Sequence, residues 1–317
     1  MAKLTEATEI FVPKYHKFQE ILKKHERGHW GVWEIDVRKD VEQWRSGKIT
    51  DRQKAFITMI LRFFTQADTN VCAGYVEKLL PSFKQADARM MLLSFASRET
   101  THMLGYKFLN DSLGLDSEEF ASEFLKYEDM KAKHEYMIEA VDLRSDKGKA
   151  EYLAKQALME GVSLFAAFAE LLTFSRMGLT PGQVDVNQWS IVDESTHCEG
   201  LTALFKEFLL EHPKVVNNEF KQAIYETARK IVAMEDASID LAYSVGEPGN
   251  LTAEDVKLYI RYVCDYRMTQ LGFKPQFGVE KNPLPWIDDL TGNIFGDFFD
   301  TTIVEYSKGN LSGEWEY

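Results

Sequence analysis

Apolar residues recur at three- and four-residue spacing through most of the chain, which is the period of an amphipathic helix. A first long helix is predicted from Asp51, which can cap it, to Pro81, which ends it. Gly, Pro or Asn near the far end stops most of the later helices. We find no convincing run of alternating residues that would indicate strands. The further helices are predicted at 85–112, 118–140, 147–177, 184–211, 217–245 and 252–271.

Long helices joined by short turns bury their apolar faces by packing side by side at small angles. The sequence therefore predicts an all-α helical bundle. No linker rich in Pro, Gly or Ser interrupts the chain before its last residues, so we expect one large helical domain at 1–300. The segment 301–317 contains Gly and Ser and lacks an apolar period, which is typical of a flexible C-terminal tail.

Composition narrows the class of protein. The chain has 317 residues, of which 45% are hydrophobic, and its net charge of −13 argues against binding to a nucleic-acid backbone. Cys72, Cys198 and Cys264 are too far apart for a zinc motif and indicate a reducing, cytoplasmic location. The N-terminus lacks a signal peptide, and the most apolar segment, 162–174, is too short to span a membrane and contains Glu170. We therefore expect a soluble protein.

Four predicted helices carry a carboxylate in the middle of the apolar stripe. These residues are Asp68, Glu99, Glu160 and Glu194. A buried carboxylate without a partner costs several kcal/mol even after relaxation. Lys and Arg residues near these positions in the sequence are too few to compensate four of them. The pattern indicates that bound cations supply the missing charge.

Two of the four carboxylates begin a Glu-x-x-His sequence, and residues three apart share one face of a helix. A lone carboxylate precedes the first motif by 31 residues and the second by 34. This arrangement is typical of a dinuclear carboxylate site in a helical bundle. The expected ligands form two half-sites: Asp68 with Glu99 and His102, and Glu160 with Glu194 and His197.

The ligand types indicate which metals the site would hold. Four ionised carboxylates balance the charge of two divalent ions, while the imidazoles bind as neutral ligands. Mixed oxygen and nitrogen ligands favour iron or manganese, whereas structural zinc favours sulfur, and calcium and magnesium favour oxygen alone. We therefore expect two ions per chain, manganese and/or iron.

The remaining histidines are interpreted as surface or structural residues. Glu26 and His29 repeat the Glu-x-x-His spacing, but they lie in a charged, glycine-containing stretch without an apolar face. We do not expect them to bind metal. The histidines outside the two motifs are His16, His25, His29, His134 and His212.

From about residue 10 to residue 317 the sequence resembles the small, radical-generating β subunit of class I ribonucleotide reductase. Besides the six ligands, the resemblance rests on the segments WGVWEID, KNPLPWID, GDFFD and VEYSKG. It implies a ferritin-like bundle that generates and stores a one-electron oxidant for reducing ribonucleotides to deoxyribonucleotides. It also implies a homodimer that binds the large subunit through its C-terminal tail, without nucleic acid or membrane.

The resemblance assigns roles to further residues. Tyr106 follows His102 by four residues, as the radical tyrosine of the family does, and Asp193 precedes a ligand as the relay aspartate does. Trp30 is similar to the relay tryptophan, with Trp33 as the competing choice. Tyr306 matches the tail tyrosine that passes the radical to the large subunit.

One departure bears on where the oxidant is stored. Better-known members surround the radical tyrosine with large apolar residues, at positions that here hold Leu164, Phe168 and Ser190. Because Ser190 makes this pocket more polar, the sequence favours an oxidant on the metals over a stable Tyr106 radical, and manganese in at least one position. Whether a flavoprotein activator takes part stays open.

Two other classes of function remain alternatives. A stand-alone dinuclear oxidase or hydroxylase would need a substrate tunnel and would have no use for Tyr306 or a mobile tail. A ferritin-like storage or metal-binding protein would need neither Trp30 nor Tyr106. The relay residues and the tail therefore favour the reductase subunit.

Overall fold

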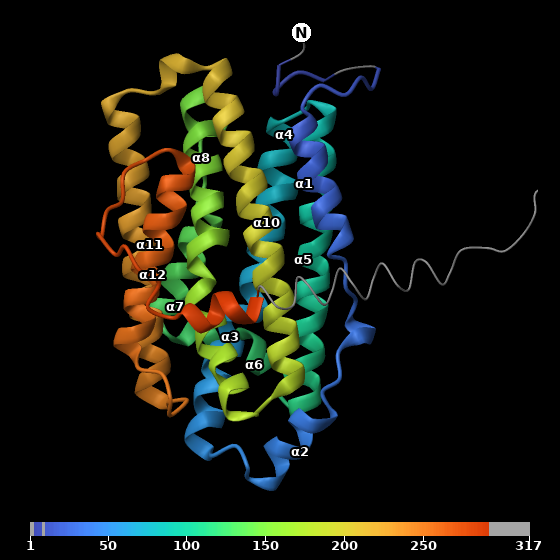
Figure 1. Cartoon of the computed structure of the whole chain (residues 1–317), viewed down its shortest axis with the longest axis vertical. Coiled ribbons are helices and arrows are strands. Elements are labelled where there is room, and N and C mark those ends of the chain that lie inside the picture. Colours follow the sequence, from blue (N-terminus) through green and yellow to red (C-terminus); the bar gives the residue numbers. More distant parts are fainter. Residues whose placement is uncertain (1–2, 8–9, 292–317) are drawn as a thin grey trace, which may run out of the picture.

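Long helices run side by side along the long axis of the molecule in a computed structural model that describes residues 3–7 and 10–291 (Figure 1). This part of the chain contains no β-strand, so the predicted all-α bundle is confirmed. The longer helices are α1 (His16–Arg27), α3 (Asp51–Ala73), α5 (Ala86–Leu113), α7 (Glu128–Ile138), α8 (Asp146–Leu158), α10 (Pro181–Glu211), α11 (Asn218–Val245) and α12 (Ala253–Leu271).

Shorter elements connect or extend these helices. Two of them, η2 and η4, are π-helical turns that continue α3 and α8. The shorter elements are η1 (Val32–Glu34), α2 (Arg38–Ser46), η2 (Gly74–Leu79), α4 (Leu80–Ser82), α6 (Glu118–Ser122), η3 (Glu123–Lys126), η4 (Met159–Ser163), α9 (Phe165–Leu172), η5 (Thr173–Met177) and η6 (Pro213–Val215).

The start of α3 shows how local sequence sets a helix boundary. Thr50, not Asp51, is the N-cap: its side chain accepts a hydrogen bond from the backbone N–H of Gln53, whose own side chain accepts one from the Thr50 backbone N–H. This capping box satisfies two N–H groups that the first helical turn leaves free. Asp51 is the first helical residue, so the prediction that it caps the helix was wrong by one position.

Two other predictions needed correction. The helix expected at 118–140 is divided into α6, η3 and α7, with a break at Tyr127, whose backbone is extended. The helices α1 and α2 were not predicted. The inward face of α1 carries Phe18, Ile21 and His25 at the three- and four-residue spacing of a helix, but its other residues are mostly charged.

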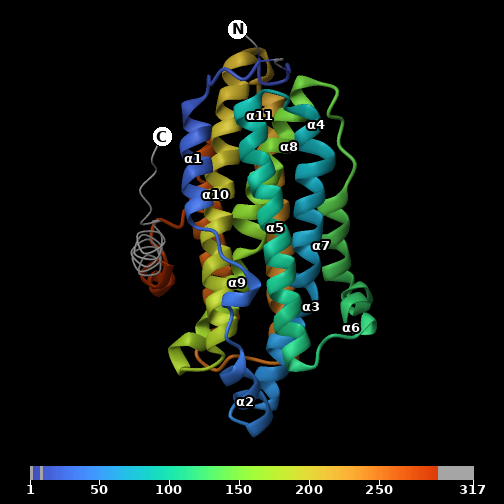
Figure 2. The ribbon, with the colours of Figure 1, turned by 90° about the vertical axis from the view of Figure 1, so that its right-hand side faces the viewer.

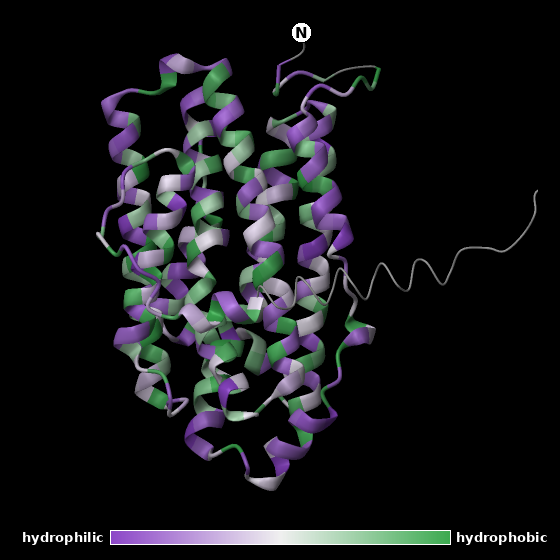
Figure 3. Ribbon diagram, viewed as in Figure 1, coloured by the Kyte–Doolittle hydropathy of each residue, from purple (hydrophilic) through white to green (hydrophobic). Residues whose placement is uncertain are grey.

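The packing of the helices brings the four predicted ligand segments together. Helix α5 lies between α3 and α1, and α10 contacts α1, α5, α8 and α9 (Figure 2). Hydrophobic and hydrophilic residues alternate around the long helices, as amphipathic packing requires (Figure 3). The segment 146–177 is the only one among the described residues long and apolar enough to cross a membrane, and 94% of its most apolar stretch is buried in the bundle.

Candidate metal centre

All six predicted ligands meet in the interior of the bundle, and each residue is at most 1% exposed. They come from three helices and one π-helical turn, far apart in the sequence. The ligand atoms fall into two groups of four, and within each group they lie within 4.8 Å of one another. The six are Asp68 on α3, Glu99 and His102 on α5, Glu160 on η4, and Glu194 and His197 on α10.

The two groups share two carboxylates, Glu99 and Glu194. The sequence grouped the ligands by their order along the chain, whereas the structure places these two glutamates between the groups. A carboxylate has two oxygens and can therefore contact two cations. The first group consists of Asp68, Glu99, His102 and Glu194, and the second of Glu99, Glu160, Glu194 and His197.

Both histidines present the same ring nitrogen to the carboxylates. The Nδ1 atom of His102 lies 3.2 Å from Glu194 Oε1, and that of His197 lies 3.0 Å from Glu99 Oε1. Their Nε2 atoms point away from the four ligand carboxylates. The Nε2 atom of His102 lies 3.1 Å from the oxygen Oδ2 of Asp193, which is not a predicted ligand. A histidine that binds metal through one nitrogen and a fixed partner through the other is held in one tautomer and orientation.

The π-helical turn η4 sets the position of Glu160. A Cβ atom at the next residue, Gly161, would lie 2.8 Å from Cys198 Sγ and 2.9 Å from Arg267 Nε. Only glycine lets these two side chains approach so closely, and Arg267 Nε donates to the Gly161 carbonyl at 3.4 Å. π-Helical turns occur frequently at functional sites because they shift side chains out of regular helical register.

A buried lysine holds the end of the same turn. Lys133 Nζ donates to the carbonyl of Ser163 at 2.7 Å and forms an ion pair of 2.5 Å with Glu235. Burial raises the pKa of Glu235 to about 7 and raises that of the nearby Glu170 well above its ordinary value. Lys133 thereby fixes the last residue of η4, while Arg267 contacts its third residue.

Two residues that the sequence analysis missed hold Glu160 by hydrogen bonds. The Tyr75 hydroxyl donates to Glu160 Oε2 at 2.5 Å, and the Gln156 amide donates to Oε1 at 2.6 Å. The second π-helical turn, η2, carries Tyr75, and Gly74 in this turn leaves room for the Gln156 side chain. The glycine within a predicted helix was the available signal for a close approach.

The charge of the cluster fits two divalent cations. Burial raises the pKa of Asp68 to about 7 and that of Glu160 to about 8, and raises the pKa values of Glu99 and Glu194 well above their ordinary range. Apart from the Nδ1 atoms of the two ligand histidines, no nitrogen or hydroxyl of the described residues is a hydrogen-bond partner of Asp68 Oδ2 or of either carboxylate oxygen of Glu99 and Glu194. Buried oxygens without donors are costly unless a cation binds them.

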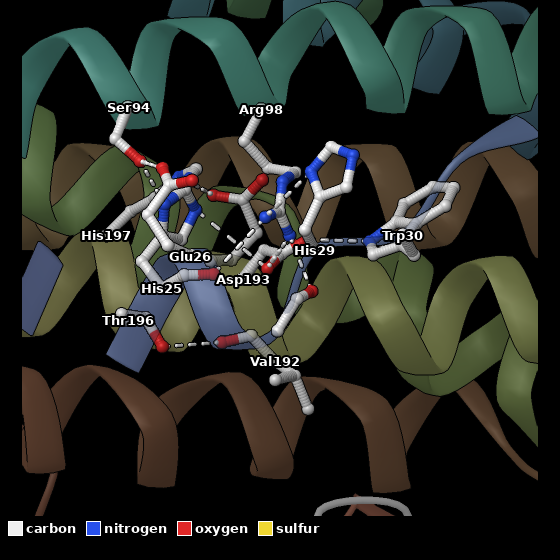
Figure 4. A network of polar contacts seen from close by, with 12 residues as sticks. His25, Glu26, His29, Trp30, Ser94, Arg98, Val192, Asp193, Thr196 and His197 are labelled. Carbon is white, nitrogen blue, oxygen red and sulfur yellow. Dashed lines mark hydrogen bonds and ion pairs between the residues drawn. The ribbon is translucent and has the colours of Figure 1, made fainter. Parts of the chain in front are cut away.

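The nearby cation, Arg98, does not compensate the ligands. Its Nη1 donates to Asp193 Oδ1 at 2.6 Å (Figure 4). The same nitrogen donates to the carbonyl of Gly28 at 2.8 Å. Although burial alone would raise it, Arg98 and His102 hold the pKa of Asp193 well below its ordinary value. Arg98 is thus paired with Asp193 and not with a ligand. This agrees with the expectation that Lys and Arg residues do not compensate the four ligand carboxylates.

Asp193 joins the predicted relay residues to the ligand cluster. Its Oδ2 accepts a hydrogen bond from Trp30 Nε1 at 2.8 Å (Figure 4). The same oxygen lies 3.1 Å from His102 Nε2. The Trp30 ring also stacks on the His102 ring, with centroids 5.8 Å apart. Trp33, the competing choice, is 78% exposed. Trp30 is thus the tryptophan that the structure places at the cluster.

His25 belongs to the surroundings of the site, which the sequence did not indicate. It is buried, and its Nε2 lies 3.1 Å from His197 Nε2. Its Nδ1 lies 2.7 Å from Ser94 Oγ, which donates to the exposed Glu26 (Figure 4). The stretch around Glu26 and His29 does have an inward face, contrary to our expectation, because α1 buries His25.

Tyr106 occupies a pocket lined by aromatic and polar residues. Its ring contacts Phe64, which in turn contacts Phe168, and its hydroxyl donates to Asn187 Oδ1 at 3.1 Å. Ser190 is buried, as expected for a residue of this pocket. Burial and the neighbouring Asp68 raise the pKa of Tyr106 well above its ordinary value, so the phenol keeps its proton.

The other predicted functional residue, Tyr306, and the segment 301–317 lie outside the described residues.

The fold and the ligand cluster together define a class of protein. A helical bundle with two linked carboxylate and histidine groups in its interior is a ferritin-like dinuclear carboxylate protein.

Comparison with known proteins identifies the family within this class. The model of the family described as ribonucleotide reductase, small chain, matches residues 7–283. The chain belongs to this family, and the resemblance seen in the sequence is confirmed. The chain is 38% identical to a probable ribonucleoside-diphosphate reductase small subunit of Invertebrate iridescent virus 3, over 92% of this chain and 82% of the relative. A small chain of Monkeypox virus is 29% identical, over 96% of this chain and 93% of the relative.

Solved structures share the fold at lower sequence identity. The ribonucleotide reductase R2 subunit from Clostridium botulinum matches with a TM-score of 0.82 and 17% identity, covering 92% of this chain and 94% of that one. The dimanganese(II)-NrdF of Streptococcus sanguinis matches with a TM-score of 0.72 and 17% identity, covering 90% of this chain and 99% of that one. These matches confirm the ferritin-like bundle.

Proposed function

We propose that this small subunit stores a one-electron oxidant in the interior of the bundle and delivers it to a large subunit that reduces ribonucleoside diphosphates. The observation that carries the proposal is the pair of buried ligand groups that share Glu99 and Glu194. The sequence relatives are named as small subunits or small chains of ribonucleoside-diphosphate reductase, which supports this substrate class. When bound, a dinuclear manganese and/or iron centre would supply the oxidant, which side chains alone cannot generate.

The six buried side chains would hold the two ions. Asp68 and His102 belong to one group, Glu160 and His197 to the other, and the two shared glutamates to both. The surrounding residues exclude water, since all six ligands are almost completely buried. Tyr75 and Gln156 would keep Glu160 in a single orientation through their hydrogen bonds.

Asp193 and Trp30 would form the first steps of an electron path that leads outward from the cluster. Asp193 remains ionised beside Arg98 and can accept hydrogen bonds from both the Trp30 indole N–H and a His102 Nε2–H. An electron that leaves Trp30 toward the cluster would leave a positive indole, and the adjacent carboxylate stabilises that charge. Trp30 is therefore proposed as a relay residue and Asp193 as the residue that orients it.

We place the stored oxidant on the metals and not on Tyr106, with manganese in at least one position. The polar Ser190 and Asn187 beside Tyr106 support storage on the metals. The dimanganese(II) form of the structural relative from Streptococcus supports only the choice of manganese. Tyr106→Phe is expected to retain substantial turnover, measured as deoxynucleotide formation with the large subunit. Complete loss of turnover together with loss of a sharp organic-radical signal in paramagnetic resonance would identify Tyr106 as the radical carrier.

We propose that residues after Tyr306 dock into the large subunit and that Tyr306 carries the radical across the interface. The aromatic residues of the terminal GEWEY are suited to anchor in a groove of a partner. Deleting residues 308–317 is expected to abolish association, measured by co-sedimentation. Tyr306→Phe is expected to bind normally but to form no deoxynucleotide, because phenylalanine cannot lose an electron and a proton together.

Both tail variants should still bind two metal ions, since neither touches a ligand. Full turnover by the truncated protein would reject the docking role, and full turnover by Tyr306→Phe would reject the radical role.

We further propose that the subunit works as a cytoplasmic homodimer. The structural relative Rnr4 of Saccharomyces cerevisiae also forms a homodimer. A flavoprotein activator is a further candidate partner.

A further inference from the structure

A second tryptophan contacts Trp30 on the outer side of the ligand cluster. Trp189 lies on α10, one helical turn before Asp193, and its ring centroid is 5.2 Å from that of Trp30, with the rings inclined at 45°. Trp30 also stacks on His102. The rings of His102, Trp30 and Trp189 therefore form a continuous series that begins at a metal ligand.

The two tryptophans differ in their access to solvent. Trp30 is 1% exposed and its indole nitrogen is occupied by Asp193, whereas Trp189 is only partly buried. Gly105 sits against the Trp30 ring, where a Cβ atom would approach to 3.2 Å, so the Trp30 ring is tightly enclosed. Among the rings of this series, Trp189 is the one that a molecule in solution can reach.

We propose that Trp189 is the solvent-facing end of a second electron path to Trp30, separate from the C-terminal tail. This inference rests on the proposed function, in which Trp30 gives up one electron toward the ligand cluster. Trp189 would donate one electron to the Trp30 radical cation. Trp30 would then be neutral and would keep its N–H hydrogen bond to Asp193. The Trp189 radical cation would release its indole proton to water, and the resulting radical would regain an electron and a proton from a small donor such as ascorbate.

The path can be tested in metal-free protein, without the large subunit. All variants would carry Trp33→Phe, because Trp33 is exposed and lies in the same segment as Trp30. A ruthenium polypyridyl complex with persulfate would oxidise accessible tryptophans under light, and peptide mass spectrometry would locate the products. We expect oxidation at Trp189 and also at the buried Trp30, which the complex cannot contact directly.

Substitutions at Trp189 separate electron transfer from packing. Trp189→Phe should eliminate oxidation of Trp30, and Trp189→Tyr should restore it, because tyrosine is an oxidisable ring and phenylalanine is not. Trp44→Phe is the matched control: Trp44 is also half-buried, but it lies on α2 against Lys54. This control should leave Trp30 oxidation unchanged.

Near-ultraviolet circular dichroism of the same proteins tests the ring pair itself. Two indoles in contact should give a coupled signal that disappears in Trp189→Phe and persists in Trp44→Phe. Undiminished Trp30 oxidation in Trp189→Phe, or absence of the coupled signal from the parent protein, would overturn the inference. Failure of the proposed function would show separately, as metal-loaded protein that gives no turnover with the large subunit.

Discussion

Glu194→Ala is expected to abolish binding of both metal ions, whereas Glu160→Ala should lose only one. The reason is that Glu194 belongs to both ligand groups and Glu160 to one. Removing the shared carboxylate leaves each group with three ligands and takes away the negative charge between the two ions. The measurement is elemental analysis of protein loaded with manganese(II) and then dialysed.

Glu170→Gln is the matched control for this comparison. Glu170 is also a buried glutamate, with one oxygen that lacks a hydrogen-bond partner, but it lies on α9 outside both ligand groups. The control should retain two ions per chain. Equal metal content in Glu194→Ala and Glu160→Ala would show that the two groups do not share Glu194.

Asp193→Asn is expected to destabilise the metal-free protein by about 3–5 kcal/mol, because it leaves the buried Arg98 without its carboxylate. Arg98 and Asp193 are 2–3% exposed at the side chain, so water cannot replace the lost partner. Asparagine can still accept the Trp30 hydrogen bond, which confines the change mainly to charge. The measurement is the free energy of unfolding in urea.

Asp236→Asn provides the comparison at the surface. Asp236 pairs with Arg261 at 2.7 Å, but both side chains are more than a quarter exposed. Ion pairs in water contribute at most about 1 kcal/mol, so this variant should lose far less stability. Equal losses in the two variants would show that burial does not determine the strength of the Arg98 pair.

Much of the fold was predictable because its signals are local. The period of apolar residues located the long helices to within a few positions, and the Glu-x-x-His spacing places two ligands on one helical face whatever surrounds it. The helix α1 was missed because its inward face includes His25, which counts as polar in a pattern of apolar residues. His25 is buried in contact with His197, which is 172 residues away in the sequence.

The arrangement of the ligands was only partly predictable. Glu99 and Glu194 belong to both groups because of the way α5 and α10 face each other. The spacing of residues within one helix does not predict how it faces another helix. The π-helical turn at Glu160 depends equally on distant partners, since Lys133 and Arg267 reach its carbonyls from α7 and α12. Contacts of this kind are set by tertiary packing, not by local sequence.

The contact between Trp30 and Trp189 illustrates the same limit. The sequence distinguished Trp30 from Trp33 by its register, and the structure places Trp30 beside Asp193, 163 residues away. Nothing in the pattern around Trp189 distinguishes it from a tryptophan that only fills space on α10. Its contact with Trp30 became visible only once the helices were placed.

The most direct test of the proposed function is deoxynucleotide formation by this chain with the large subunit from the same host. Purified protein would be prepared with two manganese or iron ions per chain and, in parallel, free of metal. Each preparation would be activated, mixed with the large subunit and supplied with a ribonucleoside diphosphate and a reductant. We predict turnover only when the metal-loaded chain and the large subunit are both present. Absence of turnover from that mixture, with two ions bound and the subunits associated, would contradict the central claim and favour a stand-alone oxidase.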